Sequence, residues 1–140
     1  MKSKPQVFLS YARLDKDKVE NLYHKLSDER FKPWMDIKDM LPGEAWEAAI
    51  QKAIRNSDLF LVCLSTNSIY KRGSIQKEIK DALDIWREML YSDIYLIPVR
   101  LEKCDVPENL SRFQWVDFRK RWNPKLYVRM AMTGILYMVL

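Results

Sequence analysis

Residue types that often carry chemistry are scarce in this chain: its 140 residues include 3 glycines, 2 cysteines and 1 histidine. So few glycines argue against a glycine-rich phosphate-binding loop, and the dinucleotide motif G-x-G-x-x-G is absent. Two cysteines form no disulfide framework, which favours a reducing compartment. A structural zinc site takes a full tetrahedral set of nitrogen or sulfur ligands, and Cys63, Cys104 and His24 are too few and too scattered to supply it. We therefore expect neither a metal ion nor a bound cofactor.

Long hydrophobic runs are also missing. A membrane-spanning helix needs about 20 apolar residues, whereas the apolar stretch 126–140 is shorter and is interrupted by Arg129. The first residues show no secretory signal pattern. The net charge of +5 is spread along the chain instead of forming a basic patch. We expect a cytoplasmic protein that neither spans a membrane nor binds nucleic acid.

What the sequence does contain is a regular alternation of short apolar runs and amphipathic stretches. Such alternation predicts a parallel sheet with helices on both faces. Five expected strands fit an α/β, flavodoxin-like five-stranded parallel sheet with strand order 2-1-3-4-5. The strands are expected at 7–9, 31–35, 59–64, 94–99 and 113–118, and helices are expected to begin near residues 15, 46, 74 and 124.

Details of the pattern add three expectations. Pro33 predicts an edge position for its strand, because proline donates no hydrogen bond to a neighbouring strand. Asp15 stands where its side chain can cap the first helix. Trp46 shares helical spacing with Ala49 and Ile50, which predicts that it faces the core.

In doubly wound sheets, ligands bind outside the carboxyl ends of the strands, at the switch point between the first and third strands. Ser10 and Tyr11 follow the first expected strand, and Asp36 follows the second. A receiver domain shares this fold, but it needs an acidic pair after the first strand and a phosphorylatable aspartate after the third. The residues at those places are not acidic, so this function is excluded.

Glu78 falls in the first turns of the expected third helix, near the mouth of that crevice. It borders the apolar stripe, because it lies three residues after Ile75 and four before Ala82. Partial burial would raise the pKa of such a carboxylate, while the positive helix end and Lys77 or Arg72 would lower it. Position alone is compatible with a catalytic carboxylate and with one that stabilises the start of the helix.

Short motifs follow one another along most of the chain: VFLSYA at 7–12, WMD at 34–36, LPGEAW at 41–46, Ser65, and QKEI at 76–79. Together they resemble a Toll/interleukin-1 receptor (TIR) domain of the bacterial type. The resemblance implies a single TIR domain over 1–140, and it leaves open whether further domains follow.

The resemblance implies two alternative functions. Many TIR domains hydrolyse or cyclise NAD⁺ and release nicotinamide, and in these enzymes a glutamate of the third helix is essential; Glu78 matches it. Other TIR domains are adaptors that act through TIR–TIR contacts. We expect an NAD⁺ glycohydrolase or cyclase that is activated by self-association, in bacterial immune or stress signalling such as antiphage defence. The alternative is a catalytically weak adaptor.

The remaining site residues are also implied by the resemblance. Segment 36–46 matches a mobile loop that gates the pocket and makes contacts between TIR domains in a homo-oligomer. Two positions depart from the family pattern, since Ser74 and Ala45 stand where enzymatic members often carry an aromatic residue. The expected substrate-binding residues are Ser10, Tyr11, Arg13, Asp36, Gly43 and Ser74, and the expected interface residues are Met40, Leu41 and Pro42.

Overall fold

The computed structural model describes residues 4–69, 74–88 and 95–118. Within them, the chain forms a five-stranded sheet of order β2-β1-β3-β4-β5, which confirms the predicted topology. Neighbouring strands are parallel. The strands are β1 (Gln6–Ser10), β2 (Lys32–Trp34), β3 (Leu59–Leu64), β4 (Leu96–Arg100) and β5 (Val116–Asp117).

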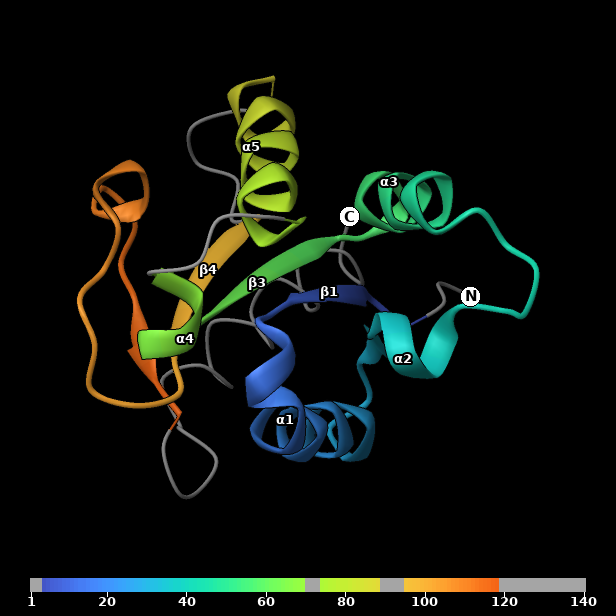
Figure 1. The fold of residues 1–140 in the computed structure, drawn as a ribbon, viewed down its shortest axis with the longest axis horizontal. Helices are drawn as coiled ribbons and strands as arrows, with labels where there is room; N and C mark the ends of the chain where they lie inside the picture. Colours follow the sequence, from blue (N-terminus) through green and yellow to red (C-terminus); the bar gives the residue numbers. More distant parts are fainter. Residues whose placement is uncertain (1–3, 70–73, 89–94, 119–140) are drawn as a thin grey trace.

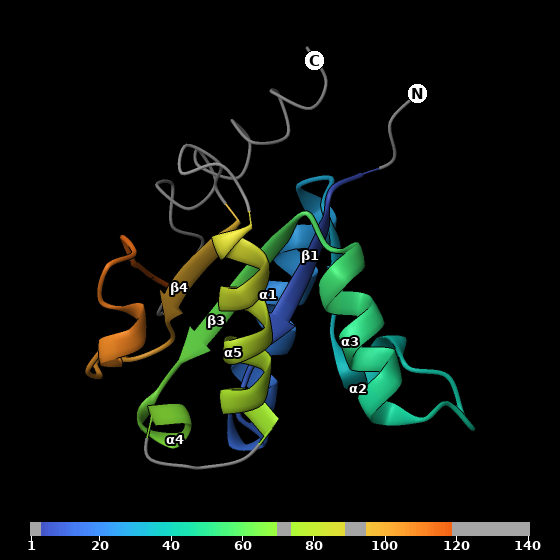
Figure 2. The same ribbon diagram turned by 90° about the horizontal axis from the view of Figure 1, so that it is seen from above.

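Helices cover both faces of the sheet (Figure 1). One helix, α1, lies on one face, while α3 and α5 lie side by side on the other, as the second view also shows (Figure 2). The helices are α1 (Lys16–Asp28), α2 (Asp36–Asp39), α3 (Trp46–Asn56), α4 (Thr66–Ile69) and α5 (Ser74–Arg87), with 3₁₀ turns η1 (Arg13–Asp15) and η2 (Glu108–Leu110).

The central strand β3 explains why its sequence is apolar without alternation. All six of its residues are buried. Because side chains alternate along a strand, Leu59, Leu61 and Cys63 pack on the α1 side, and the residues between them pack under α3 and α5. Each face of the sheet thus has its own hydrophobic core.

A stack of aromatic rings crosses three strands on the α3 side of the sheet. Phe8 of β1 lies between Trp34 of β2 and Phe60 of β3, with ring centroids 5.2 and 5.1 Å apart. The ring planes are inclined by 12° and 7°, so the rings pack almost parallel. This stack adds side-chain contact to the short edge strand β2, where the edge position predicted from Pro33 is confirmed.

Several boundaries differ from the sequence-based expectation. β5 holds two residues, whereas a strand was expected over 113–118. Phe113 instead packs edge-on against Trp86 of α5, with ring centroids 4.9 Å apart, so the start of that apolar run belongs to the helix layer. The short helices α2 and α4 were not predicted. The helix expected near residue 124 and the stretch 126–140 lie outside the described residues.

A helix that crosses a bilayer must be long and apolar. Within residues 4–69, 74–88 and 95–118, no helix is both long and apolar enough to cross a membrane.

Candidate functional site

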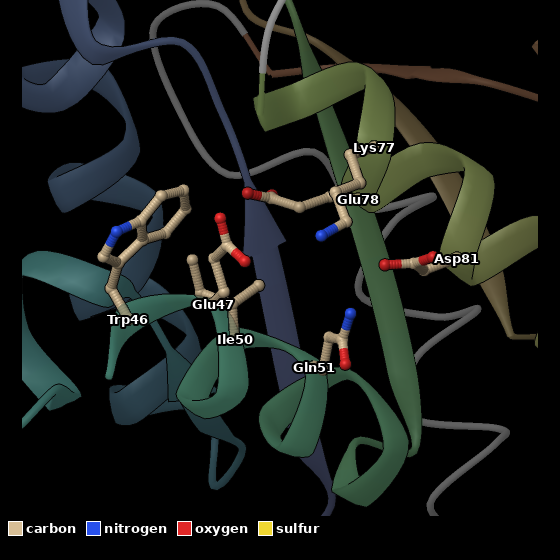
Figure 3. A pocket seen from close by; sticks show the side chains of 7 residues that line it. All are labelled: Trp46, Glu47, Ile50, Gln51, Lys77, Glu78 and Asp81. Carbon is tan, nitrogen blue, oxygen red and sulfur yellow. The ribbon is translucent and has the colours of Figure 1, made fainter. Parts of the chain in front are cut away.

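A cavity of about 220 Å³ opens between α3 and α5 (Figure 3). The side chains of Trp46, Glu47 and Glu78 point into the same space, and the amine of Lys77 reaches it from α5. Its lining residues come from the N-terminal and middle turns of the two helices: Trp46, Glu47, Ile50 and Gln51 from α3, and Lys77, Glu78 and Asp81 from α5.

Helical spacing explains how α5 presents these side chains. Ile79, Ala82 and Leu83 are buried against the sheet. Residues three or four apart share a helix face, so Glu78 and Asp81 lie together at the border of that buried stripe and line the cavity. The border position of Glu78 agrees with the sequence pattern.

Glu78 is partly buried, and its surroundings disfavour its charged form. Loss of solvation raises the pKa of Glu78 to about 7. The hydroxyl of Ser10 acts in the opposite direction, and the neighbouring carboxylates of Asp36 and Asp81 raise the pKa further. The cavity therefore holds a carboxyl group that exchanges its proton near neutral pH, a property common at catalytic sites.

Tyr11 and Asp36 are joined to each other and are coupled electrostatically to Glu78, although neither is among the described residues that line the cavity. The Tyr11 hydroxyl donates a hydrogen bond of 2.5 Å to Asp36 Oδ1, which also accepts the backbone N–H of Ile37 at 2.8 Å. Burial and the bond to Asp36 raise the pKa of the Tyr11 phenol far above its usual range, and the charge of Glu78 adds to this effect. The fold thus brings Tyr11, Asp36 and Glu78 into one electrostatic neighbourhood.

Ser10, the last residue of β1, lies beneath this group. Its side chain is 0% exposed, so it does not form part of the cavity surface. No group in the described part of the chain bonds Ser10 Oγ with full hydrogen-bond geometry. The carboxylate that its hydroxyl stabilises is that of Glu78.

Other residues expected in the site lie around it. Arg13 is exposed in η1 and lowers the pKa of Tyr11, which places its charge near the phenol. Gly43 is exposed in the turn between α2 and α3 and has a φ of +87°. Ser74 begins α5. Gly43 is not among the described residues that line the cavity.

The three expected interface residues differ in exposure. Leu41 is 68% exposed, and Pro42 is exposed beside it. Met40 is partly buried, because it packs against the core under α3 and α5. Ile37 of α2, which no motif singled out, is 50% exposed. The apolar surface of this segment is therefore formed by Ile37, Leu41 and Pro42 more than by Met40.

Two sequence-based expectations were wrong. Trp46 was expected in the core but is 54% exposed, because it sits in the first turn of α3, where that helix borders the cavity instead of the sheet. Asp15 occupies the position before α1 but makes no side-chain capping bond. Its buried carboxylate instead accepts hydrogen bonds from the Ser65 hydroxyl and, at 2.9 Å, from Asn67 Nδ2. Asp15 thus ties the β1–α1 connection to the turn after β3.

Sequence reasoning overlooked part of the cavity lining. Glu47, Gln51 and Asp81 belong to no motif, although the helical spacing from Glu78 to Asp81 could have indicated the last of them. As for metals, no cluster of three or more candidate ligands exists among the residues that the structure describes. His24 is exposed, and burial raises the pKa of the Cys63 thiol well above its usual range.

One curated protein is similar to this chain in sequence. The uncharacterised protein y4cD of Sinorhizobium fredii is 29% identical over 102 residues, which cover 73% of this chain. The chain spans 16% of the length of that curated relative. The likeness is therefore to one segment of a much longer protein.

Solved structures provide a second comparison. The TIR domain of the Toll-related receptor TRR-2 from Hydra magnipapillata is 25% identical, covers 95% of this chain and 96% of its own, and has a TM-score of 0.67. Two further structures share the fold at lower identity. The TIR domains of the activated Roq1 resistosome are 21% identical, with 97% of this chain and 74% of that chain covered and a TM-score of 0.58. The CMP N-glycosidase BcmB of Clostridium botulinum is 20% identical, with 94% of this chain and 98% of that chain covered and a TM-score of 0.53.

The model of one protein family matches residues 7–130, which is most of the chain. That family is described as the TIR domain. Its match agrees with the strand order, with the helices on both faces and with the likeness to solved TIR structures. This chain belongs to the TIR domain family.

Proposed function

We propose that this TIR domain is an NAD⁺ glycohydrolase or cyclase that cleaves the bond between nicotinamide and ribose. The observation that carries the proposal is the Glu78 carboxyl group, which is partly buried in a cavity and shares that cavity with an exposed indole, that of Trp46. A carboxyl group and an aromatic ring are the groups that a reaction at a charged nicotinamide ring would use.

The chemistry needs a fixed negative charge. The C–N bond to ribose is weakened by the positive charge of the nicotinamide ring, and nicotinamide leaves as a neutral molecule. The ribose then takes on oxocarbenium character, which the Glu78 carboxylate stabilises, as carboxylates do in glycoside hydrolysis. Attack by water gives ADP-ribose, and attack by the adenine of the same substrate gives a cyclic product.

The electrostatics of the cavity favour a cation at this place. Asp36 and Asp81 raise the pKa of Glu78 because they add negative charge around it. A bound nicotinamide cation opposes that charge, so it lowers the pKa of Glu78 and draws the group into its ionised form. Substrate binding thus prepares the carboxylate that the reaction requires.

Two further residues fit parts of NAD⁺. The Trp46 indole offers a flat apolar surface on which a nicotinamide ring can stack. Lys77 brings a positive charge into the same space, suited to the pyrophosphate. The volume of about 220 Å³ suits one half of the dinucleotide, so we expect the adenosine half to extend out of the cavity.

Relatives give indirect support. The structural neighbour BcmB is named as a CMP N-glycosidase, so a protein of related fold cleaves an N-glycosidic bond. The TIR domains of Roq1 are seen in a resistosome that recognises a pathogen effector, which supports activation by self-association and a role in immune signalling. The exposed side chains of Ile37 and Leu41 offer an apolar surface for such contacts. The same surface would serve a catalytically weak adaptor.

One experiment separates these functions. The chain is incubated with NAD⁺ at several protein concentrations, released nicotinamide is measured, and the product is identified by mass spectrometry. Glu78→Gln should lower release roughly 10²-fold or more. The matched control is Glu29→Gln, which changes an exposed carboxylate after α1 on the opposite face of the sheet. Equal release by wild type and Glu78→Gln contradicts the proposal. Concentration-dependent association with no release in any variant supports the adaptor.

A further inference from the structure

We infer that Ser10 is a positioning residue, whose buried hydroxyl holds the side chain of Glu78 in place at the inner wall of the cavity. The inference rests on the proposed catalytic role of Glu78. It replaces the expectation that Ser10 contacts substrate, because a side chain that is 0% exposed presents no surface to a ligand.

The position of Ser10 in the sheet brings its hydroxyl to the cavity from below. Ser10 ends β1, beside Val62 of β3, at the carboxyl edge of the sheet. Side chains two residues apart in a strand share a face, so Ser10 projects toward the same layer as Phe8, which belongs to the core under α3 and α5. That is the layer in which Glu78 lies.

The hydroxyl is unusual in its surroundings. Its neighbours along β1 and β3 are apolar and buried, including Leu9 and Val62. Within the described residues, Ser10 Oγ is the buried side-chain atom that lacks a well-formed hydrogen bond. A buried polar group without a partner destabilises a fold, and the carboxyl group of Glu78 is the group that this hydroxyl influences.

A hydroxyl suits a partner that changes its protonation. It donates to a carboxylate and accepts from a carboxylic acid, so Ser10 can hold Glu78 in both forms. Several charged or titratable groups surround Glu78 and act on the same equilibrium. Asp36 at the start of α2, Asp81 on α5 and the phenol of Tyr11 act on it directly. Glu47 on α3 and Lys77 on α5 line the same cavity, and Arg13 in η1 acts on Tyr11.

The test measures the titration of Glu78 directly, in the full chain and without substrate. The side-chain carboxyl carbon is labelled with ¹³C, its NMR signal is assigned from the spectrum of Glu78→Gln, and its shift is followed with pH. Ser10→Ala should move the titration midpoint to higher pH, because the donor that favours the carboxylate is gone. Ser10→Thr, which restores a hydroxyl, should bring the midpoint back toward that of wild type.

Ser57→Ala is the matched control. Ser57 is also buried, but its hydroxyl donates to the carbonyl of Ala53 at 2.6 Å, at the opposite end of the sheet. A purely structural serine would change stability and leave the titration of Glu78 unmoved, as this control should. If Ser10→Ala titrates like wild type, the inference is overturned. If Ser10→Ala does not fold, Ser10→Cys, which keeps the size and has a much weaker donor, gives the same measurement.

A second readout keeps this inference separate from the proposed function. With NAD⁺ as substrate, Ser10→Ala should lower kcat roughly tenfold and leave KM nearly unchanged, because a hydrogen bond to a charged group is lost away from the substrate. If wild type releases no nicotinamide but the midpoint still moves in Ser10→Ala, the proposed function fails and the positioning contact stands. If wild type releases nicotinamide but the titration midpoint of Glu78 does not move in Ser10→Ala, the proposed function stands and the positioning role of Ser10 fails.

Discussion

The Tyr11 hydroxyl donates a 2.5 Å hydrogen bond to Asp36, and this contact joins the end of β1 to the start of α2. Tyr11→Phe removes the contact and should destabilise the fold by about 1 kcal/mol, measured by urea denaturation. Tyr23→Phe is a matched control, since Tyr23 of α1 is also partly buried but makes a longer bond of 3.3 Å to Asp39. Equal losses of unfolding free energy in the two variants would show that the Tyr11–Asp36 bond stabilises the fold no more than the Tyr23–Asp39 bond does.

Asp36 also acts on Glu78 through its charge. Asp36→Asn should lower the titration midpoint of Glu78, because a negative neighbour that raises its pKa is replaced by a neutral one. The same ¹³C titration measures it. Asp58→Asn is the control, because Asp58 accepts the backbone N–H of Gln6 at 2.9 Å at the other end of β1. A midpoint that stays in place in Asp36→Asn contradicts this account of the cavity.

The raised pKa of Glu78 predicts how stability varies with pH. The folded chain holds this proton up to a pKa of about 7, whereas the unfolded chain releases it near 4.5. The group therefore favours folding in acid, and this contribution is lost as the pH rises from 4.5 through 7. Glu78→Gln should be more stable than wild type at pH 8, by on the order of 1–3 kcal/mol, and nearly equal at pH 4. Denaturation across this pH range checks it; a constant difference would refute it.

Gly43 tests the turn between α2 and α3. Its φ of +87° strains any L side chain, although a Cβ would meet no atom within 4 Å. Gly43→Ala should cost about 1 kcal/mol of stability from backbone conformation alone. Gly43→Asn should cost less, because asparagine tolerates a positive φ. The order of the two denaturation midpoints is the readout, and the reverse order would mean that side-chain contacts dominate at this position.

Leu41 tests the assembly surface. Leu41→Ala should weaken self-association, followed by analytical ultracentrifugation, and should make nicotinamide release rise less steeply with protein concentration. Leu14→Ala is a control of equal exposure, since both leucines are 68% exposed but Leu14 lies in η1. The assembly surface lies elsewhere if both variants associate as wild type does.

The strand order was predictable because a strand that is buried on both faces has a continuous apolar sequence without alternation. The apolar run 59–64 indicated an inner strand, and Pro33 indicated an edge, which the sheet confirms. Proline alone does not decide the position, because Pro98 lies in β4, which has a neighbouring strand on each side. The boundaries of β5 were not predictable, because the apolar side chain of Phe113 packs against Trp86 of α5 and is not part of a strand. Helices of four residues, such as α2 and α4, are too short to show a periodic pattern.

The candidate site was predictable only where a motif or a strand end marked it. In this way the sequence indicated Glu78, which lines the cavity, and Tyr11 and Asp36, which are coupled to it electrostatically. Trp46 was misplaced because helical spacing shows which residues share a face, but not where that face runs past the sheet. Asp15 was misplaced because its partners, Ser65 and Asn67, are distant in sequence and nearby only in the fold.

The ring stack of Trp34, Phe8 and Phe60 gives the edge strand β2 side-chain contacts to the inner strands of the sheet. Edge strands usually open first and exchange their amide hydrogens fastest. Here the rings pack β2 against β1 and β3, so we expect β2 to open together with these strands and not before them. Amide hydrogen exchange as slow in β2 as in β1 would mean that the segment beginning at Asp36 starts from a firmly held strand.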